Sequence, residues 1–167
     1  EIARLLEDSS DPVQISLQRN YMLVDLVHTK ITSRLLDGDF INYKQIIPAS
    51  FDTTVTVPKE QFESGLERAM LLARSEKNNL VRFDVKENVM QLSSTSEAGN
   101  ITEKIPVKVT GMDIAISFNA RYYAELLKFV QSEYIVIKFT NSSSPCVVVP
   151  TDSPEDFIYL ILPVRMI

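Results

Sequence analysis

The order of apolar and polar residues along this chain repeats one arrangement of secondary structure. Strict alternation of the two classes predicts a strand, and apolar residues three or four positions apart predict a helix. By these rules the middle of the chain contains a strand, a helix and three further strands, at 53–58, 59–77, 80–87, 89–96 and 102–110. A unit of this composition is typical of the α+β class.

Two other segments follow the same order. The later segment predicts a strand, a helix and three strands at 113–118, 119–131, 134–140, 145–151 and 157–165. The earlier segment lacks the leading strand and predicts a helix and three strands at 1–8, 12–18, 21–27 and 29–36. The spacing of about 60 residues indicates a repeat in architecture rather than in letters. We therefore predict one domain at 49–167, preceded at 1–48 by the second half of another domain and a connector.

Each of the two later helices has one apolar stripe for a core. The stripe of the helix at 59–77 is formed by Phe62, Leu66, Ala69 and Ala73. At about 100° per residue, Leu71 lies on the opposite side and Leu72 on the flank. Leu71 is therefore either a single exposed leucine or a contact to another subunit.

The helix at 119–131 begins at Asn119, which is a favoured N-cap residue. Its buried stripe is formed by Tyr123, Leu126, Leu127 and Val130. Its outer face carries Arg121, Glu125 and Lys128. Taken alone, that outer face is typical of an ordinary solvated helix surface.

Composition is that of a globular domain with a core. Hydrophobic residues make up 45% of the 167 residues and charged residues 23%. No apolar run approaches the ~20 residues of a membrane helix, and no signal-peptide pattern opens the chain. A single cysteine, Cys146, excludes an internal disulfide and favours a reducing, cytoplasmic setting. The chain opens with EIARLLEDSS, without Met, and we interpret it either as a fragment of a longer chain or as a chain that is ordered only from this point.

No set of residues in the sequence supports catalysis or a cofactor. The one histidine, His28, has no second histidine or cysteine at ligand spacing, so we expect no metal site. Cys146 lies in the strand pattern PCVVVP, where a buried, inert thiol is expected. With four glycines there is no phosphate-cradling loop, and no nucleophile–base signature is present. We predict that the protein is not an enzyme, and its net charge of −5 argues against a tight grip on DNA.

The connector LLDGDFINYKQIIP at 35–48 is strongly apolar, although connectors generally run over the surface and are polar. SRLLDGDFINYKQIIP (33–48) and the terminal YLILPVRMI (159–167) together resemble the beta sliding clamp of bacterial DNA polymerase III. The resemblance covers the whole chain, as the end of the middle domain and all of the C-terminal domain. It implies the DNA-clamp fold, with helices lining the interior of a ring and antiparallel sheets outside.

The resemblance implies a head-to-tail homodimeric ring that encircles duplex DNA without reading its sequence and catalyses nothing. Its partners would be the DNA polymerase III catalytic subunit, the clamp loader and other proteins with a clamp-binding motif. Encirclement retains DNA by topology, so an acidic protein with weak phosphate contacts is compatible with this role. The DNA-facing candidates, implied by their position on outer helix faces, are Arg4, Arg68, Arg74, Lys77, Arg121 and Lys128.

The resemblance also implies a peptide-binding pocket where the connector meets the C-terminal tail. Its candidate residues are Ile41, Gln45 and Ile46 from the connector, Cys146 near the rim, and Leu160, Leu162, Pro163, Val164 and Arg165 from the tail. Many family members have proline at the position of Ile41, and isoleucine keeps this wall of the pocket apolar. Many have arginine at the position of Gln45, and glutamine removes that positive charge.

Leu71, Leu72 and the strand at 102–110 would meet the other subunit, because an exposed strand edge favours pairing. The alternative is a separate peptide-binding module of similar fold that does not encircle DNA. Ring assembly distinguishes the two.

Overall fold

Two units of structure lie along the chain, and their boundary falls inside the apolar connector. The N-terminal unit is Glu1–Asn42 and the C-terminal unit is Tyr43–Ile167. The computed structural model describes residues 2–6, 11–74, 79–154 and 157–165.

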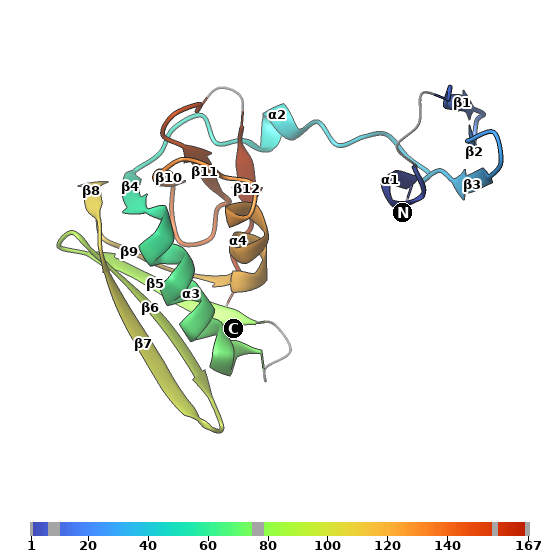
Figure 1. Ribbon diagram of the computed structural model, residues 1–167. Helices are drawn as coiled ribbons and strands as arrows, with labels where there is room; N and C mark the ends of the chain where they lie inside the picture. The colour runs from blue at the N-terminus through green and yellow to red at the C-terminus, as the bar shows by residue number, and fades with distance from the viewer. Residues whose placement is uncertain (1, 7–10, 75–78, 155–156, 166–167) are drawn as a thin grey trace. The chain divides into compact units, whose positions relative to one another are not determined.

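The N-terminal unit contains a short helix and a three-stranded antiparallel sheet of order β1-β2-β3 (Figure 1). Its elements are α1 (Ile2–Leu5), β1 (Gln14–Leu17), β2 (Tyr21–Asp25) and β3 (Lys30–Arg34). The three strands predicted from alternation are thus confirmed. Lys30 Nζ lies 2.8 Å from Asp25 Oδ2 and joins the two ends of the β2–β3 turn. Among the described residues of this unit only Val24 is buried, so most of its apolar side chains are open to solvent.

The C-terminal unit combines two antiparallel sheets with two adjacent helices and one short helical turn (Figure 1). The first sheet has the order β12-β11-β10-β4-β8, formed by Tyr159–Ile161, Cys146–Pro150, Tyr134–Phe139, Thr53–Pro58 and Lys108–Gly111. The second has the order β7-β6-β5-β9, formed by Gly99–Pro106, Val89–Ser96, Leu80–Lys86 and Ile114–Asn119. The helices are α2 (Tyr43–Ile46), α3 (Lys59–Ala73) and α4 (Ala120–Leu127).

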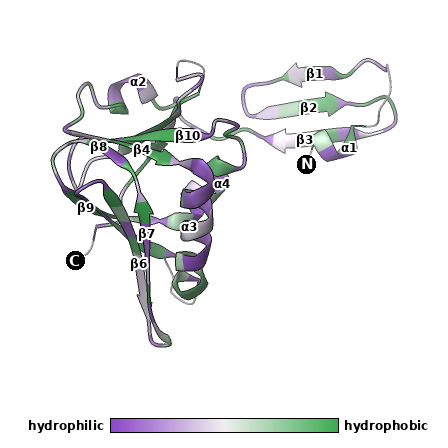
Figure 2. Ribbon diagram, turned by 60° about the vertical axis from the view of Figure 1, so that its left-hand side comes forward, coloured by the Kyte–Doolittle hydropathy of each residue, from purple (hydrophilic) through white to green (hydrophobic). Residues whose placement is uncertain are grey.

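Helix α3 packs against α4, against β4 of the first sheet and against β5, β6 and β7 of the second. Every residue named for the two predicted stripes is buried. The stripe of α3 is confirmed, and that of α4 is confirmed for Tyr123, Leu126 and Leu127, whereas Val130 lies beyond the end of α4 at Leu127. The predicted N-cap of α4 is confirmed as well, since Asn119 Oδ1 accepts from the Arg121 N–H at 3.1 Å. Figure 2 shows β4 and β10 as mainly hydrophobic and the visible side of α4 as largely hydrophilic.

Four aromatic rings form the centre of the core: Phe62 of α3, Phe83 of β5, Phe118 of β9 and Tyr123 of α4, each 0% exposed. Their centroid separations run from 5.0 Å for Phe83–Tyr123 to 5.8 Å for Phe62–Phe83. Aromatic pairs at such distances contribute about 0.5–1.5 kcal/mol each beyond the area that they bury. Two of the rings come from the first strand–helix–strand repeat of this unit and two from the second, so the cluster connects the two repeats.

The two repeats of the C-terminal unit are interlocked. The first is β4-α3-β5-β6-β7 and the second is β9-α4-β10-β11-β12, in the predicted order of strand, helix and three strands. However, β4 pairs with β10 and β9 pairs with β5, so each leading strand lies in the sheet of the other repeat. Neither repeat can complete its sheet without the other.

The alternation over 102–110 predicts one strand, but the chain forms two strands in different sheets. β7 ends at Pro106 as an edge of the second sheet, and β8 begins at Lys108 as an edge of the first. Asn88 holds this crossing: its carbonyl oxygen accepts from Val107 N at 2.9 Å, and its side chain accepts from Val109 N at 3.0 Å. The alternation continues without a break through Val107, so the pattern carries no sign of the change of sheet.

Candidate functional site

The C-terminal tail is fixed along the edges of both sheets. In β12, Leu160 pairs with Val147 of β11. Beyond β12, the backbone N–H of Val164 donates to the carbonyl oxygen of Ser117 at 2.8 Å. Ser117 belongs to β9, so the tail connects the β12 edge of one sheet with the β9 edge of the other.

Side chains of this tail differ in exposure. Leu162 is 64% exposed. Leu160, Pro163 and Val164 are half-buried, and Arg165 is exposed. A backbone held at both ends, with a projecting leucine between them, provides one wall of an apolar surface.

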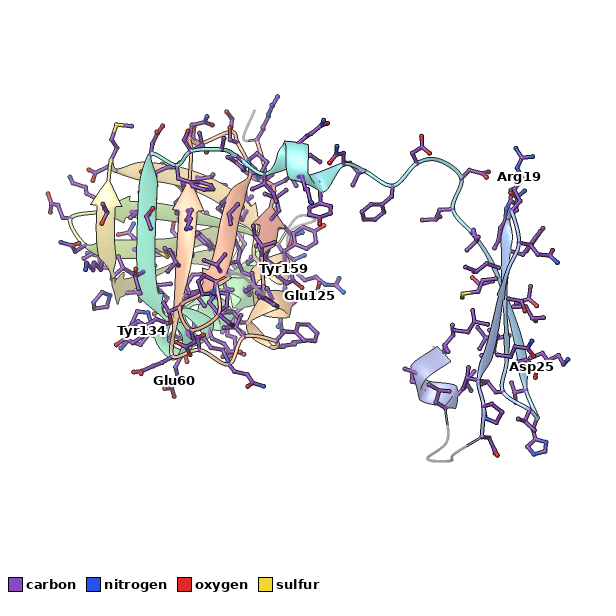
Figure 3. The ribbon with its side chains drawn as sticks, turned by 90° about the horizontal axis from the view of Figure 1, so that it is seen from above. Arg19, Asp25, Glu60, Glu125, Tyr134 and Tyr159 are labelled. Atoms are coloured by element: carbon purple, nitrogen blue, oxygen red, sulfur yellow. The ribbon has the colours of Figure 1, made fainter. Side chains whose placement is uncertain are left out.

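Helix α2 lies beside the β11–β12 edge of the first sheet (Figures 1 and 3). On this helix Ile46 is half-buried and Gln45 is exposed. Val147 and Val149 of β11 are 2% and 5% exposed, although they alternate with the core residues of that strand. The outer face of β11 is therefore covered. The end of the connector, at residues 46–48, is half-buried and belongs to the same unit as the tail.

Cys146 does not reach this surface. Its side chain is 0% exposed, and its Sγ lies 3.0 Å from Tyr123 Oη. Burial is the main cause that raises the pKa of the Cys146 thiol to about 12, and it also raises the pKa of Tyr123 well above its ordinary value. The expected burial of this thiol is confirmed. The prediction near a pocket rim is corrected to a position beneath the surface, because the side chain points into the core.

Ile41 lies in the N-terminal unit, with its side chain 62% exposed. Two other apolar connector residues, Leu36 and Phe40, are 97% and 86% exposed. The connector thus presents large apolar side chains that its own unit does not cover.

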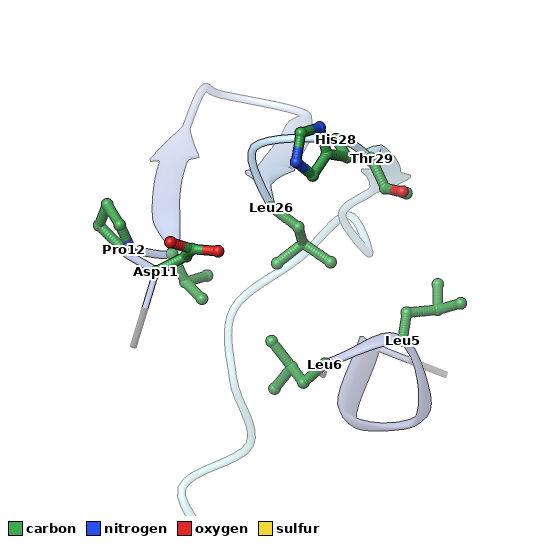
Figure 4. A pocket seen from close by; sticks show the side chains of 8 residues that line it. Leu5, Leu6, Asp11, Pro12, Leu26, His28 and Thr29 are labelled. Atoms are coloured by element: carbon green, nitrogen blue, oxygen red, sulfur yellow. The ribbon is translucent and has the colours of Figure 1, made fainter. Parts of the chain in front are cut away.

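A cavity of about 310 Å³ opens on the N-terminal unit (Figure 4). Its lining is formed by Leu5, Leu6, Asp11, Pro12, Val13, Leu26, His28 and Thr29. Five of these side chains are apolar, so the cavity exposes apolar surface of this unit. In the described part of the chain, no group of three His, Cys, Asp or Glu side chains is placed to hold a metal ion. None of the described helices is long and apolar enough to cross a membrane.

Charged candidates on the outer face of α3 are not equivalent. Arg68 Nη2 lies 2.8 Å from Glu103 Oε2, which places the guanidinium against the β7 edge. This hydrogen bond raises the pKa of Arg68 and lowers that of Glu103. Arg4 lies on α1 of the N-terminal unit, and Lys77 lies outside the described residues.

On α4, Arg121 Nε lies 3.0 Å from Glu125 Oε1, one turn along the helix. Lys128 follows one turn later and is exposed. Within the described residues, neither Lys128 nor Arg74 forms an ion pair. No carboxylate among the described residues would have to be released from these two cations before they meet an anion.

The β7 edge and the neighbouring surface of α3 form a second exposed feature. β7 is an edge strand, and Leu71 of α3 is 64% exposed, as its helical position predicts. Leu72 is half-buried. An open strand edge beside an exposed leucine is typical of a surface that pairs with another chain.

Two contacts are missing from the sequence-based prediction, one that anchors the tail and one inside the core. Ser117 anchors the tail through its backbone carbonyl, and no side-chain pattern indicates such a role. Tyr123 is predicted as a core residue, but nothing in its helical spacing indicates that its hydroxyl meets the thiol of Cys146.

Two interlocked strand–helix–strand repeats, with paired helices and antiparallel sheets, define a domain of the clamp fold. The chain belongs to the DNA polymerase III beta subunit family, because residues 44–165 match the family model of that subunit's C-terminal domain. A beta sliding clamp from Streptococcus pneumoniae is 34% identical over 99% of this chain and 44% of its own length. One from Staphylococcus aureus is 28% identical over the same shares.

Solved structures agree with this assignment. The DNA polymerase III beta chain of Streptococcus pneumoniae has a TM-score of 0.83 and 33% identity, over 99% of this chain and 44% of that one. The sliding clamp of Bacillus subtilis has a TM-score of 0.80 and 31% identity over the same shares. The resemblance seen in the connector and tail, and the α+β clamp fold, are thus confirmed. The chain spans less than half the length of these relatives.

Proposed function

We propose that this chain is the C-terminal part of a DNA sliding clamp, a processivity factor that encircles duplex DNA and tethers the replicative polymerase. Family membership supports this role, because the curated relatives are beta sliding clamps. The adjacent helices α3 and α4 fit the lining of a ring, and the two sheets fit its outer layer. Retention by topology needs no strong phosphate contacts, which agrees with the net charge of −5. The role requires no catalysis and belongs in the cytoplasm, where the chromosome is copied.

Partner proteins bind, in this proposal, to an apolar pocket formed by the connector and the tail. The observation that carries it is the fixed tail, on which Leu162 projects 64% exposed between the two sheet edges. Ile46 of α2 would form the facing wall, with Gln45 next to it in the chain. The family resemblance adds Ile41 as a further candidate for this pocket. The partners are the DNA polymerase III catalytic subunit, the clamp loader and other proteins with a clamp-binding motif.

A short peptide with one aromatic anchor suits such a pocket. Burying ~150–250 Å² gives roughly 4–6 kcal/mol at ~25 cal/mol/Å². Ordering the peptide takes back a few kcal/mol, so a motif with several apolar anchors reaches an affinity near micromolar. Partners held at that affinity can exchange on a single site, as a shared tether requires.

The ring itself would close through a head-to-tail homodimer. Leu71 and Leu72 of α3 and the open edge of β7 form the surface proposed for this contact. Pairing of β7 with an edge strand of the other subunit would continue the sheet across the junction.

Retention on DNA tests the proposal. The full-length protein is loaded by a clamp loader onto nicked circular DNA, and one half of the sample is then linearised. Retention on the circle and loss from the linear form are expected, and blocking the linear ends should restore retention. Equal loss from both forms would contradict encirclement. If peptide binding persisted in that case, a separate peptide-binding module would be the better description.

A further inference from the structure

The two long helices of the C-terminal unit present different charge balances. The exposed stripe of α3 is formed by Glu60, Glu67, Leu71 and Arg74. The exposed stripe of α4 is formed by Arg121, Glu125 and Lys128. The α3 stripe therefore has two carboxylates against one cation, whereas the α4 stripe has two cations against one carboxylate. Figure 3 labels one carboxylate of each stripe, Glu60 and Glu125.

Arg68 does not offset the acidic balance of α3. It lies to the side of the stripe, where it is hydrogen-bonded to Glu103 of β7 at 2.8 Å. The side chain of Glu103 is 24% exposed and that of Arg68 is 52% exposed, so the carboxylate is the shielded member of this pair. A phosphate would have to displace a sheltered carboxylate in order to reach Arg68.

The pair on α4 is of another kind. Arg121 and Glu125 have side chains 68% and 48% exposed, and an exposed pair at i, i+4 is weak and easily exchanged. A phosphate can take the place of Glu125 beside Arg121. Lys128, one turn further along, is available without any exchange among the described residues.

We propose that α4, rather than α3, carries this domain's contact with the DNA backbone, through Lys128 and Arg121. Glu125 limits the strength of that contact by competing with phosphate for Arg121. The inference rests on the proposed function as a sliding clamp. Arg121 can pass from one phosphate to Glu125 and then to the next phosphate. The guanidinium therefore has a partner at every stage, and this exchange allows the protein to move along DNA.

Salt dependence of DNA binding tests this assignment. The full-length protein is titrated against a short fluorescent duplex between 50 and 200 mM salt, and the slope of log K on log salt is measured by anisotropy. Lys128→Gln should reduce the magnitude of the slope by ~0.9, which is ~3.5-fold in affinity across this fourfold range of salt. Glu125→Gln should steepen the slope and tighten binding. Arg68→Gln should change the slope by less than a third of the Lys128→Gln effect.

Lys86→Gln is the matched control, because Lys86 is an exposed lysine at the end of β5 and belongs to neither helix. Circular dichroism of each variant checks that it is folded. An unchanged slope for Lys128→Gln, equal effects of Lys128→Gln and Arg68→Gln, or no binding of the duplex would each overturn the assignment to α4. Loss of the wild-type protein from circular DNA would instead contradict the proposed function, so the two failures are distinct.

Discussion

Gly111 tests the reasoning about the crossing between the two sheets. It ends β8, pairs with Thr53 at the start of β4, and has φ +107°. A Cβ added there would collide with the carbonyl oxygen of Asp52 and lie 3.0 Å from Thr53 Cα. Both neighbours are backbone atoms, which cannot move aside as a flexible side chain does. Gly111→Ala is therefore expected to separate β8 from β4.

The size of the effect follows from the contacts at this point. Positive φ alone strains alanine by about 1–3 kcal/mol. Separation of the strands also breaks the hydrogen bonds from Met112 N to Asp52 O, at 3.3 Å, and from Thr53 Oγ1 to Met112 O, at 2.7 Å. At about 0.5–1.5 kcal/mol each, these bonds add about 1–3 kcal/mol. The expected loss in the free energy of unfolding is about 2–6 kcal/mol.

Gly99 provides the matched control, since it has φ +138° and no atom within 4 Å of an added Cβ. Gly99→Ala should show the backbone strain alone, at about 1–3 kcal/mol. Urea unfolding followed by far-UV circular dichroism measures both variants, because the chain has no tryptophan. Equal destabilisation of the two variants, within about 0.5 kcal/mol, would refute the role of the close approach at Gly111.

Three further predictions concern the thiol, the tail and the subunit contact. Cys146 should resist a thiol reagent at pH 8 until the protein unfolds. Its folded pKa of about 12 exceeds its ordinary value of 9.0. The contribution of the protonated thiol to the free energy of unfolding should therefore be fully present below pH 9 and be lost as pH rises towards 12. Rapid labelling of the native protein would contradict the burial of Cys146. Leu162→Ala should leave stability nearly unchanged and weaken a partner peptide by about 5–30-fold in calorimetry. Met112→Ala, equally 64% exposed, is the control, and equal affinity of both variants would reject the pocket. Leu71→Lys in the full-length protein should shift dimer towards monomer in sedimentation velocity, and an intact dimer at low concentration would count against that interface.

Local pattern predicts most of the secondary structure. The strand pattern TTVTVP has the same bounds as β4, and Asn119 caps α4 as its residue type indicates. Both outcomes depend on neighbouring residues alone. The division of 102–110 into β7 and β8 depends instead on Asn88, and the exchange of leading strands depends on which sheet each strand joins. The alternation of apolar and polar residues predicts neither the division into two strands nor the exchange of the leading strands.

Candidate charges are harder to rank from sequence for the same reason. Arg68 of α3 and Lys128 at the C-cap of α4 are both exposed cations, and neither residue type nor helical spacing shows which of them has a carboxylate partner. The difference is the partner of Arg68, Glu103, which is 35 residues away along the chain and becomes a neighbour only when α3 packs on β7. The pairing of Arg121 with Glu125, by contrast, follows from their i, i+4 spacing.

The hydrogen bond between Val164 and Ser117 has a consequence for successive partners. If peptides bind to the proposed pocket, the backbone at Val164 is ordered before they arrive, and most of the conformational freedom lost on binding would be that of the peptide. The tail backbone would then keep one course from one partner to the next.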